Sequence, residues 1–232
     1  MSKPLQPPDA DAVVLRQAMQ FVAAALAIPA NGQILRRLPM VSLPDAWLVA
    51  GCLFQAVWNN QSDRTACAGV KDYDLFYYDD RDLSWAAEDE AIGFAHAVLT
   101  DVPVTCDIKN QARVHLWYEQ RFGSPYLRLQ NTRGGIDRFL VAGTCVGLST
   151  NADGTLKLYA PFGLDDIFDG LLRPNPLMPD AAAFLAKAAT YQARWPHLRI
   201  EMTMREMVPQ HRHHMTISAD AAFATKGARV IR

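Results

Sequence analysis

Apolar residues recur every three or four positions in several stretches of this chain, which is the spacing of helices that bury one face. The first stretch begins near residue 10 and predicts a helix of about 16 residues, with Val14, Met19 and Val22 on its apolar side. The same spacing predicts further helices after Asn31, after Gly51, from Asp82 or Ser84, over Asn110–Arg121, over Gly163–Leu172, and from Asp180 to about Arg194.

Shorter apolar runs bounded by turn-forming residues predict strands between these helices. In chain order the runs are Leu48–Ala50, Val70–Tyr78, Val102–Ile108, Gly143–Leu148 and Leu156–Ala160. The last two predict a β-hairpin, because the segment Asn151–Gly154 between them is rich in residues that favour tight turns. Strands therefore lie among helices along the chain, which indicates a mixed fold.

The second of these runs contains two carboxylates, Asp72 and Asp74, separated by one residue. Side chains in a strand alternate between its faces, so the two acids would project together while Tyr73 and Leu75 face the other way. Like charges this close repel each other and add nothing to the stability of a sheet. A divalent cation reverses that balance, since Mg²⁺ prefers hard oxygen ligands beside substrate phosphates. The pair is therefore interpreted as half of a metal site.

Two flanking features extend this interpretation. Before the pair, an apolar run ends at Gly51-Cys52 and a helix follows, a geometry in which backbone N–H groups at the helix start hold a phosphate. After the pair, alternation in the third run places Asp107 on its polar face together with Lys109. Because a triphosphate needs cations close to the acids, Lys109 and Arg113 are the expected phosphate contacts.

A strand with a glycine turn and helix, an Asp-x-Asp strand and a third acid together resemble the nucleotidyltransferase superfamily of DNA polymerase beta. Over residues 10–197 the chain is similar to one family of bacterial nucleotidyltransferase-like proteins. The resemblance implies an α/β (α+β) fold, with a small twisted mixed β-sheet and helices mainly on one face. The segments that carry it are Trp47–Cys52 with Trp58-Asn59, Lys71–Asp74, Lys109–Tyr118, Tyr159–Asp166 and Arg194–Pro196.

The resemblance also implies an activity, the transfer of a nucleoside monophosphate from an NTP to a hydroxyl of a small-molecule or protein acceptor. Asp72, Asp74 and Asp107 would be the catalytic residues and the ligands of Mg²⁺ or Mn²⁺, and Asp107 would also orient the acceptor hydroxyl. The turn of the superfamily is usually Gly-Ser or Gly-Gly, so Cys52 lacks a hydroxyl that would touch phosphate. The residues expected to bind nucleotide or phosphate are Gly51, Cys52, Lys71, Lys109 and Arg113.

The composition of the chain limits the classes of partner that are expected. With 232 residues, 50% of them hydrophobic and 20% charged, the chain is long enough for one large globular domain. A formal net charge of −1 argues against a surface for duplex nucleic acid, so the expected partners are an NTP and an unknown acceptor. The four cysteines show no C-x-x-C spacing, and the chain has no signal-peptide pattern or long apolar run. A cytoplasmic location without a membrane partner is expected, and self-association stays open.

Composition divides the chain into four expected segments. The first is a disordered Pro-rich lead over 1–9, and the second is a nucleotidyltransferase-like domain over 10–175. A helical extension packed on that domain is expected over 176–204, followed by a polar basic tail over 205–232. The tail contains His211, His213 and His214, whose polar setting favours a flexible segment over a metal site. Two other function classes stay open. One is a catalytically silent nucleotide-binding or interaction module of the same fold, and the other is a metal-dependent phosphohydrolase, which would need a His/Asp cluster.

Overall fold

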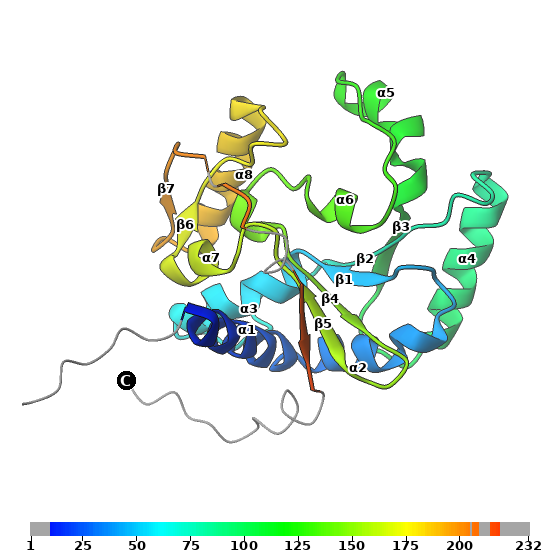
Figure 1. Cartoon of the computed structure of the whole chain (residues 1–232), viewed down its shortest axis with the longest axis horizontal. Helices are drawn as coiled ribbons and strands as arrows, with labels where there is room; N and C mark the ends of the chain where they lie inside the picture. The colour runs from blue at the N-terminus through cyan, green and yellow to red at the C-terminus, as the bar shows by residue number, and fades with distance from the viewer. Residues whose placement is uncertain (1–9, 205, 209–213, 219–232) are drawn as a thin grey trace, which may run out of the picture.

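A computed structural model describes residues 10–204, 206–208 and 214–218, and its centre is a six-stranded mixed sheet (Figure 1). The strand order is β3-β2-β1-β4-β5-β8, in which β2 and β3 are parallel and the other neighbouring pairs are antiparallel. The strands are β1 Trp47–Val49, β2 Tyr73–Tyr77, β3 Cys106–Asn110, β4 Gly147–Thr150, β5 Leu156–Tyr159 and β8 His214–Ile217. A second, two-stranded sheet pairs β6 (Leu171–Leu172) with β7 (Arg199–Ile200).

The longer helices supply the buried layer on one face of the large sheet. These are α1 Ala10–Leu26, α2 Pro29–Arg37, α3 Gly51–Gln61 and α4 Trp85–Val98, while α8 Ala181–Arg194 packs on α3. The short helices α5 Tyr118–Phe122 and α6 Arg133–Ile136 lie on the other side of the sheet, opposite α1 and α3 (Figure 1). The remaining short elements are η1 Leu38–Met40, η2 Gln111–Leu116, η3 Ala142–Thr144 and α7 Asp165–Asp169.

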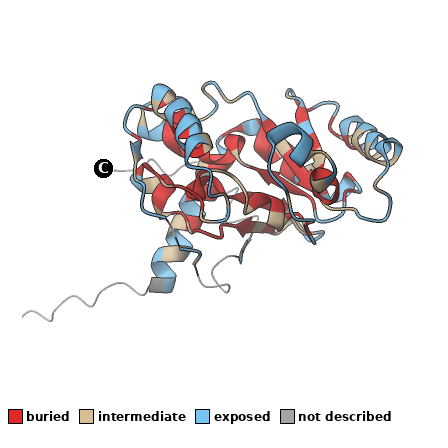
Figure 2. Ribbon diagram, turned by 90° about the horizontal axis from the view of Figure 1, so that it is seen from above, coloured by how far each residue is buried: buried red, intermediate tan, exposed pale blue. Residues whose placement is uncertain are grey.

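A row of four leucines shows how the strand register builds the core. Leu75, Leu48, Leu148 and Leu158 are directly opposite one another on β2, β1, β4 and β5, and each has no exposed surface. Burying a leucine stabilises the fold by roughly 1.5–3 kcal/mol relative to leaving it in water. Figure 2 shows that such buried residues concentrate in the sheet and on the inner sides of the helices.

The opposite face of the sheet carries a second row that is mostly polar. Following the register across six strands, this row is Asp107, Asp74, Val49, Gly147, Tyr159 and His214. A small apolar cluster that includes Trp47, Phe76 and Ile136 covers the middle of this face. The polar side chains of this row lie at its two ends, Asp107 and Asp74 at one and Tyr159 and His214 at the other.

Aromatic packing fixes α8 against α3. The ring of Trp58 lies 5.2 Å from that of Tyr191 and 5.2 Å from that of Trp195. Trp195 also donates a hydrogen bond from Nε1 to Oδ1 of Asn59 (2.9 Å). Such edge-on aromatic pairs contribute about 0.5–1.5 kcal/mol each beyond their buried area. Residues 181–195 are therefore held beside the C-terminal half of α3.

The mixed fold, the β4–β5 hairpin and the helix after Asp180 confirm the prediction from sequence. Two expectations were wrong. Asn110–Arg121 is not a single helix, because β3 continues through Asn110, whose side chain caps η2 by accepting from the Ala112 N–H (3.0 Å). The region expected to be a polar tail contributes β8, because Met215 and Ile217 alternate with polar residues and pack against the core. Residues 1–9, His211 and His213 lie outside the described residues.

No single helix in the described part of the chain is long and apolar enough to cross a membrane. The helices over Asp11–Leu26 and Pro29–Met40 reach such a length and hydropathy only together, and they are bent by 101° at their junction.

Candidate active site

Asp74 and Asp107 are direct neighbours on the parallel strands β2 and β3. Both project from the face opposite the main core, since the alternating residues Tyr73 and Leu75 are buried among the helices. Their side chains line one cavity of about 500 Å³, together with Asp72, which precedes β2. The three predicted carboxylates therefore border the same open pocket at one end of the polar row.

The environment of Asp74 disfavours its ionised form. The side chain is 23% exposed, and burial raises its pKa to about 6. Lys109 opposes that rise, whereas the negative charges of Asp107 and Asp72 add to it. A carboxyl group surrounded by other acids and partly removed from water is a common arrangement in sites that bind a cation.

Lys109 is the cation that the chain itself places between these acids. Its ammonium group pairs with Asp107 and lies 3.9 Å from Oδ1 of Asp74. The pairing follows from strand alternation, which puts residues 107 and 109 on the same face of β3. Lys71 is exposed and lines the same pocket beside Asp72. Both predicted lysines are thus near the carboxylates, although only Lys109 forms an ion pair with them among the described residues.

The carboxylates fit a divalent cation as a partial set of ligands. Within the described residues, no group of three or more His, Cys, Asp or Glu side chains is arranged so that it holds an ion unaided. Mg²⁺ is commonly bound through only one or two carboxylates, with waters and substrate phosphates completing its shell. Asp74 and Asp107 would supply those two ligands, and Asp72 borders the same pocket.

The glycine turn lies beside these acids because β1 and β2 are antiparallel. Val49, the last residue of β1, is opposite Asp74, and α3 begins two residues later at Gly51. Ala50 turns the chain with a φ of 58°, an uncommon value for a residue other than glycine. A side chain at Gly51 would come within 2.7 Å of Nε2 of Gln55 and 3.9 Å of the Asp72 carbonyl oxygen. A Cβ at this position would therefore displace the end of the Gln55 side chain.

The Cys52 side chain has no contact with the pocket. It is fully buried, its Sγ lies 3.6 Å from the Val49 carbonyl oxygen, and burial raises the pKa of the thiol well above its usual range. Only the backbone N–H of Cys52 is left for the predicted phosphate contact. Neither this N–H nor that of Gly51 donates to an acceptor among the described residues, as is usual in the first turn of a helix.

Three residues that interact with this turn or with Asp74 were not predicted from sequence, namely Gln55, Lys187 and Arg194. Arg194 at the end of α8 donates from Nη2 to Oε1 of Gln55 (3.0 Å) and to the Gly69 carbonyl oxygen (2.9 Å). It thereby joins α8, the first turns of α3 and the loop before β2. Lys187, one turn from Tyr191 on α8, lowers the pKa of Asp74 by its charge. The only sequence signal was the run Arg194–Pro196 within the family resemblance.

Arg113 is not part of this site, which corrects its assignment to phosphate binding. Its side chain is 3% exposed, forms an ion pair with Glu88 and stacks 4.0 Å over the ring of Trp85. Glu88 in turn accepts a hydrogen bond from the Asn110 N–H (3.1 Å), at the end of β3 away from Asp107. The Arg113 guanidinium therefore holds η2 against α4. Arg113 is only six residues from Asp107 in sequence, but β3 extends between them and places Arg113 at the far end of the strand.

Comparisons with known proteins bear on the family and the fold of the chain. A solved NMR structure described as a CCA-adding enzyme head domain superposes with a TM-score of 0.59 at 25% sequence identity, covering 75% of this chain and 91% of that one. A family model described as Nucleotidyltransferase matches residues 36–200. No functionally curated protein matches the sequence.

The mixed sheet, its helical face and the carboxylates beside a glycine turn define a nucleotidyltransferase head. The chain belongs to the nucleotidyltransferase family whose model spans residues 36–200. This span crosses the boundary expected at residue 175 and includes α8, whose contacts with α3 place Arg194 at the glycine turn.

Proposed function

We propose that this protein is a Mg²⁺- or Mn²⁺-dependent nucleotidyltransferase that transfers a nucleoside monophosphate from an NTP to a hydroxyl of a small-molecule or protein acceptor. One observation carries the proposal, the direct pairing of Asp74 and Asp107 across two strands beside the start of α3. The raised pKa of Asp74 supports it, because an unfavourable negative charge is relieved when a cation binds.

In this reaction Asp74 and Asp107 would hold the divalent ion, which would neutralise charge on the phosphates and align them. Lys109 leaves Asp107 and pairs with phosphate oxygens, while the free N–H groups of Gly51 and Cys52 donate to the same triphosphate.

The chemical step forms a bond between the acceptor oxygen and the α-phosphorus and breaks the bond from that phosphorus to pyrophosphate, which leaves. Asp107 is 58% exposed, faces the open side of the pocket and accepts the proton of the acceptor hydroxyl. Arg194 keeps Gln55 against the glycine turn, so that the turn stays in place while the phosphates bind.

A catalytically silent nucleotide-binding module of the same fold is the second candidate. Two observations favour it, the absence of a hydroxyl at position 52 and the ion pair that Lys109 already forms with Asp107. The four cysteines are free thiols, which supports a cytoplasmic location for either function. The charge of −1 supports an acceptor other than duplex nucleic acid.

The decisive experiment is incubation with each α-labelled nucleoside triphosphate and Mg²⁺ or Mn²⁺ in cell extract. Wild type should release pyrophosphate and transfer label to an acceptor, and Asp74→Asn should do neither. Asp89→Asn, at an exposed position on α4, removes the same charge away from the pocket and should behave as wild type. Nucleotide binding without transfer in any extract would favour the silent module.

A further inference from the structure

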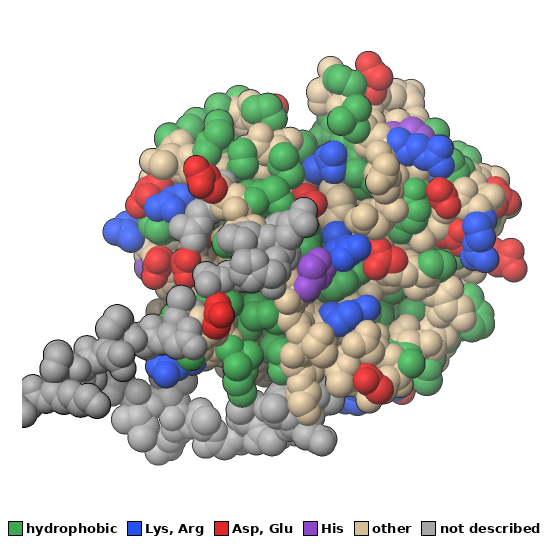
Figure 3. Space-filling model, viewed as in Figure 1, with side chains coloured by type: hydrophobic (Ala, Val, Ile, Leu, Met, Phe, Trp, Pro, Cys, Tyr) green, Lys and Arg blue, Asp and Glu red, His purple; other side chains and the backbone are tan. Residues whose placement is uncertain are grey.

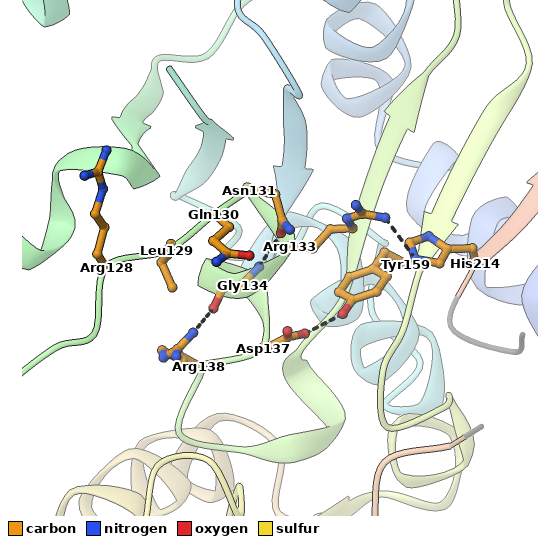
Figure 4. A pocket seen from close by; sticks show the side chains of 10 residues that line it. All are labelled: Arg128, Leu129, Gln130, Asn131, Arg133, Gly134, Asp137, Arg138, Tyr159 and His214. Atoms are coloured by element: carbon orange, nitrogen blue, oxygen red, sulfur yellow. Dashed lines mark hydrogen bonds between the residues drawn. The ribbon is translucent and has the colours of Figure 1, made fainter. Parts of the chain in front are cut away.

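A second cavity of about 500 Å³ lies on the same face of the sheet, and arginines are its main charged residues (Figure 4). Arg128, Arg133 and Arg138 line it, and Asp137 is the one acid among the described lining residues. Because Arg128 pairs with Asp80 outside the lining (3.3 Å), Arg133 and Arg138 are the arginines that give the cavity its positive charge. The whole chain has a net charge of −1. Basic side chains and a histidine gather over the centre of this face in Figure 3. The described lining of the cavity is therefore positively charged, although the protein as a whole has a small net negative charge.

Asp137 forms no ion pair with Arg133 or Arg138 among the described residues. Asp137 accepts a hydrogen bond of 2.6 Å from the hydroxyl of Tyr159, whose pKa is raised by burial and by that carboxylate. Among the described residues, Arg133 and Arg138 form no ion pair. Arg133 donates to Nε2 of His214 (3.1 Å), and Arg138 donates to the Gly134 carbonyl oxygen (2.6 Å). Each guanidinium has five N–H donors, so most of them are not used by these bonds.

The arginines are held by a rigid base. Thr132, just before α6, is fully buried and bonds Asp45 through both its N–H (2.9 Å) and its hydroxyl (2.6 Å). Ile136 at the end of α6 is also fully buried. Gly134, which lies between these two buried residues, donates its N–H to Oδ1 of Asn131 (3.0 Å). A cationic site on an immobilised turn binds an anion without first having to order its own backbone.

This cavity is separate from the carboxylate pocket. The two share no lining residue. In the polar row of the sheet, Tyr159 is three strands from Asp74, or about 14 Å at the usual strand spacing. Gly147 lies between them, and a side chain there would meet Ile136 at 2.9 Å, so Ile136 covers the sheet at that point. Ile136 therefore lies between the carboxylate pocket and the arginine cavity at this point of the sheet.

We propose that the arginine cavity is a second ligand site, which binds the phosphate group of a phosphorylated small molecule. A phosphomonoester carries a charge of about −1.5 to −2 at neutral pH, which is opposite in sign to that of Arg133 and Arg138. Planar guanidinium groups bind phosphate oxygens through paired N–H donors, and half-buried arginines do so with less competition from water. The ligand is distinct from the NTP, so the inference goes beyond the proposed transferase activity.

The test is calorimetric titration with ribose 5-phosphate, inorganic phosphate and unphosphorylated ribose. Ribose 5-phosphate should bind and ribose should not, while inorganic phosphate distinguishes recognition of the phosphate alone from recognition of the whole ester. In the double variant Arg133→Gln/Arg138→Gln, affinity should fall by about tenfold or more, because charge-assisted hydrogen bonds are lost. Arg16→Gln/Arg121→Gln removes the same charge from exposed positions and should leave affinity unchanged.

Three results would overturn the proposal. These are equal affinity in the two double variants, binding of ribose as tight as that of its phosphate, and displacement of the ester by a single-stranded oligonucleotide whose affinity is far higher and steeply salt-dependent. If the Gln variant does not fold, Arg133→Lys/Arg138→Lys keeps the charge without the planar fork and should still weaken binding. Asp74→Asn should retain ester binding, so failure of the transferase proposal and failure of this one are distinguishable.

Discussion

Replacing Asp74 by asparagine should stabilise the protein when no ligand is bound. The pKa of this carboxyl group is raised from 3.8 to about 6, a difference of about 2 units that corresponds to about 3 kcal/mol. Because the folded-state pKa is the higher one, this destabilisation is absent below pH 3.8, grows as the pH rises and is complete above about pH 6. Asparagine has nearly the same shape and no charge, so it removes the cost.

The pKa of about 6 already includes the opposing charge of Lys109, whose ammonium lies 3.9 Å from Oδ1 of Asp74. The expected stabilisation at pH 7.5 is therefore about 3 kcal/mol, and a protein of this length gains roughly 2–4 °C in Tm per kcal/mol. At pH 4 the two proteins should melt at nearly the same temperature. Thermal unfolding followed by circular dichroism at both pH values measures the difference, with Asp89→Asn as the matched control.

The same variant should lose stabilisation by Mg²⁺ and nucleoside triphosphate together, since a neutral amide is a poor ligand for a hard cation. Wild type should gain about 2.7 kcal/mol at a ligand concentration one hundred times its Kd. An Asp74→Asn protein that melts below wild type at pH 7.5 would refute the reasoning, because the carboxylate would then be a structural partner of Lys109. Equal stabilisation of both proteins by ligand would remove Asp74 from the metal site.

Three other substitutions test further parts of the structure. Gly51→Ala should change stability by about 1 kcal/mol or less, because only the flexible end of Gln55 must move, yet it should weaken NTP binding in the same thermal assay. Arg113→Met should cost about 3–5 kcal/mol in denaturant unfolding by leaving Glu88 unpaired, and Arg113→Met/Glu88→Leu should recover most of that loss. Ile217→Ala should cost about 2–5 kcal/mol if β8 is part of the core, whereas a solvated tail would show no change.

The carboxylate pocket was accessible to sequence reasoning because its residues are local. Asp72 and Asp74 are two positions apart, and strand alternation alone sets their common side. Asp107 required one further step, the pairing of β3 with β2 in parallel, and the family resemblance supplied it. The glycine turn was found for the same reason, since a strand, Gly51 and a helix follow one another without interruption.

Sequence reasoning failed where function depends on side chains from distant segments. Arg194 reaches the glycine turn across 139 residues of chain from Gln55, and nothing in its local sequence indicates that contact. Arg113 was misplaced because proximity along the chain was taken for proximity in space, although β3 extends between it and Asp107. β8 was not predicted because it is four residues long and its alternation rests on only two apolar positions, Met215 and Ile217.

The polar row that crosses the sheet explains why this face has polar side chains at both ends and an apolar, covered middle. Strand register brings Asp107, Asp74, Val49, Gly147, Tyr159 and His214 to one face, and the absence of a side chain at Gly147 lets Ile136 cover the middle. At the acidic end, burial and the neighbouring acids raise the pKa of Asp74, and the proposed cation would offset this unfavourable charge. The arginine end has the opposite charge and would attract an anion. Because the covered centre separates the two ends, a ligand at one end does not neutralise the charge at the other by direct contact.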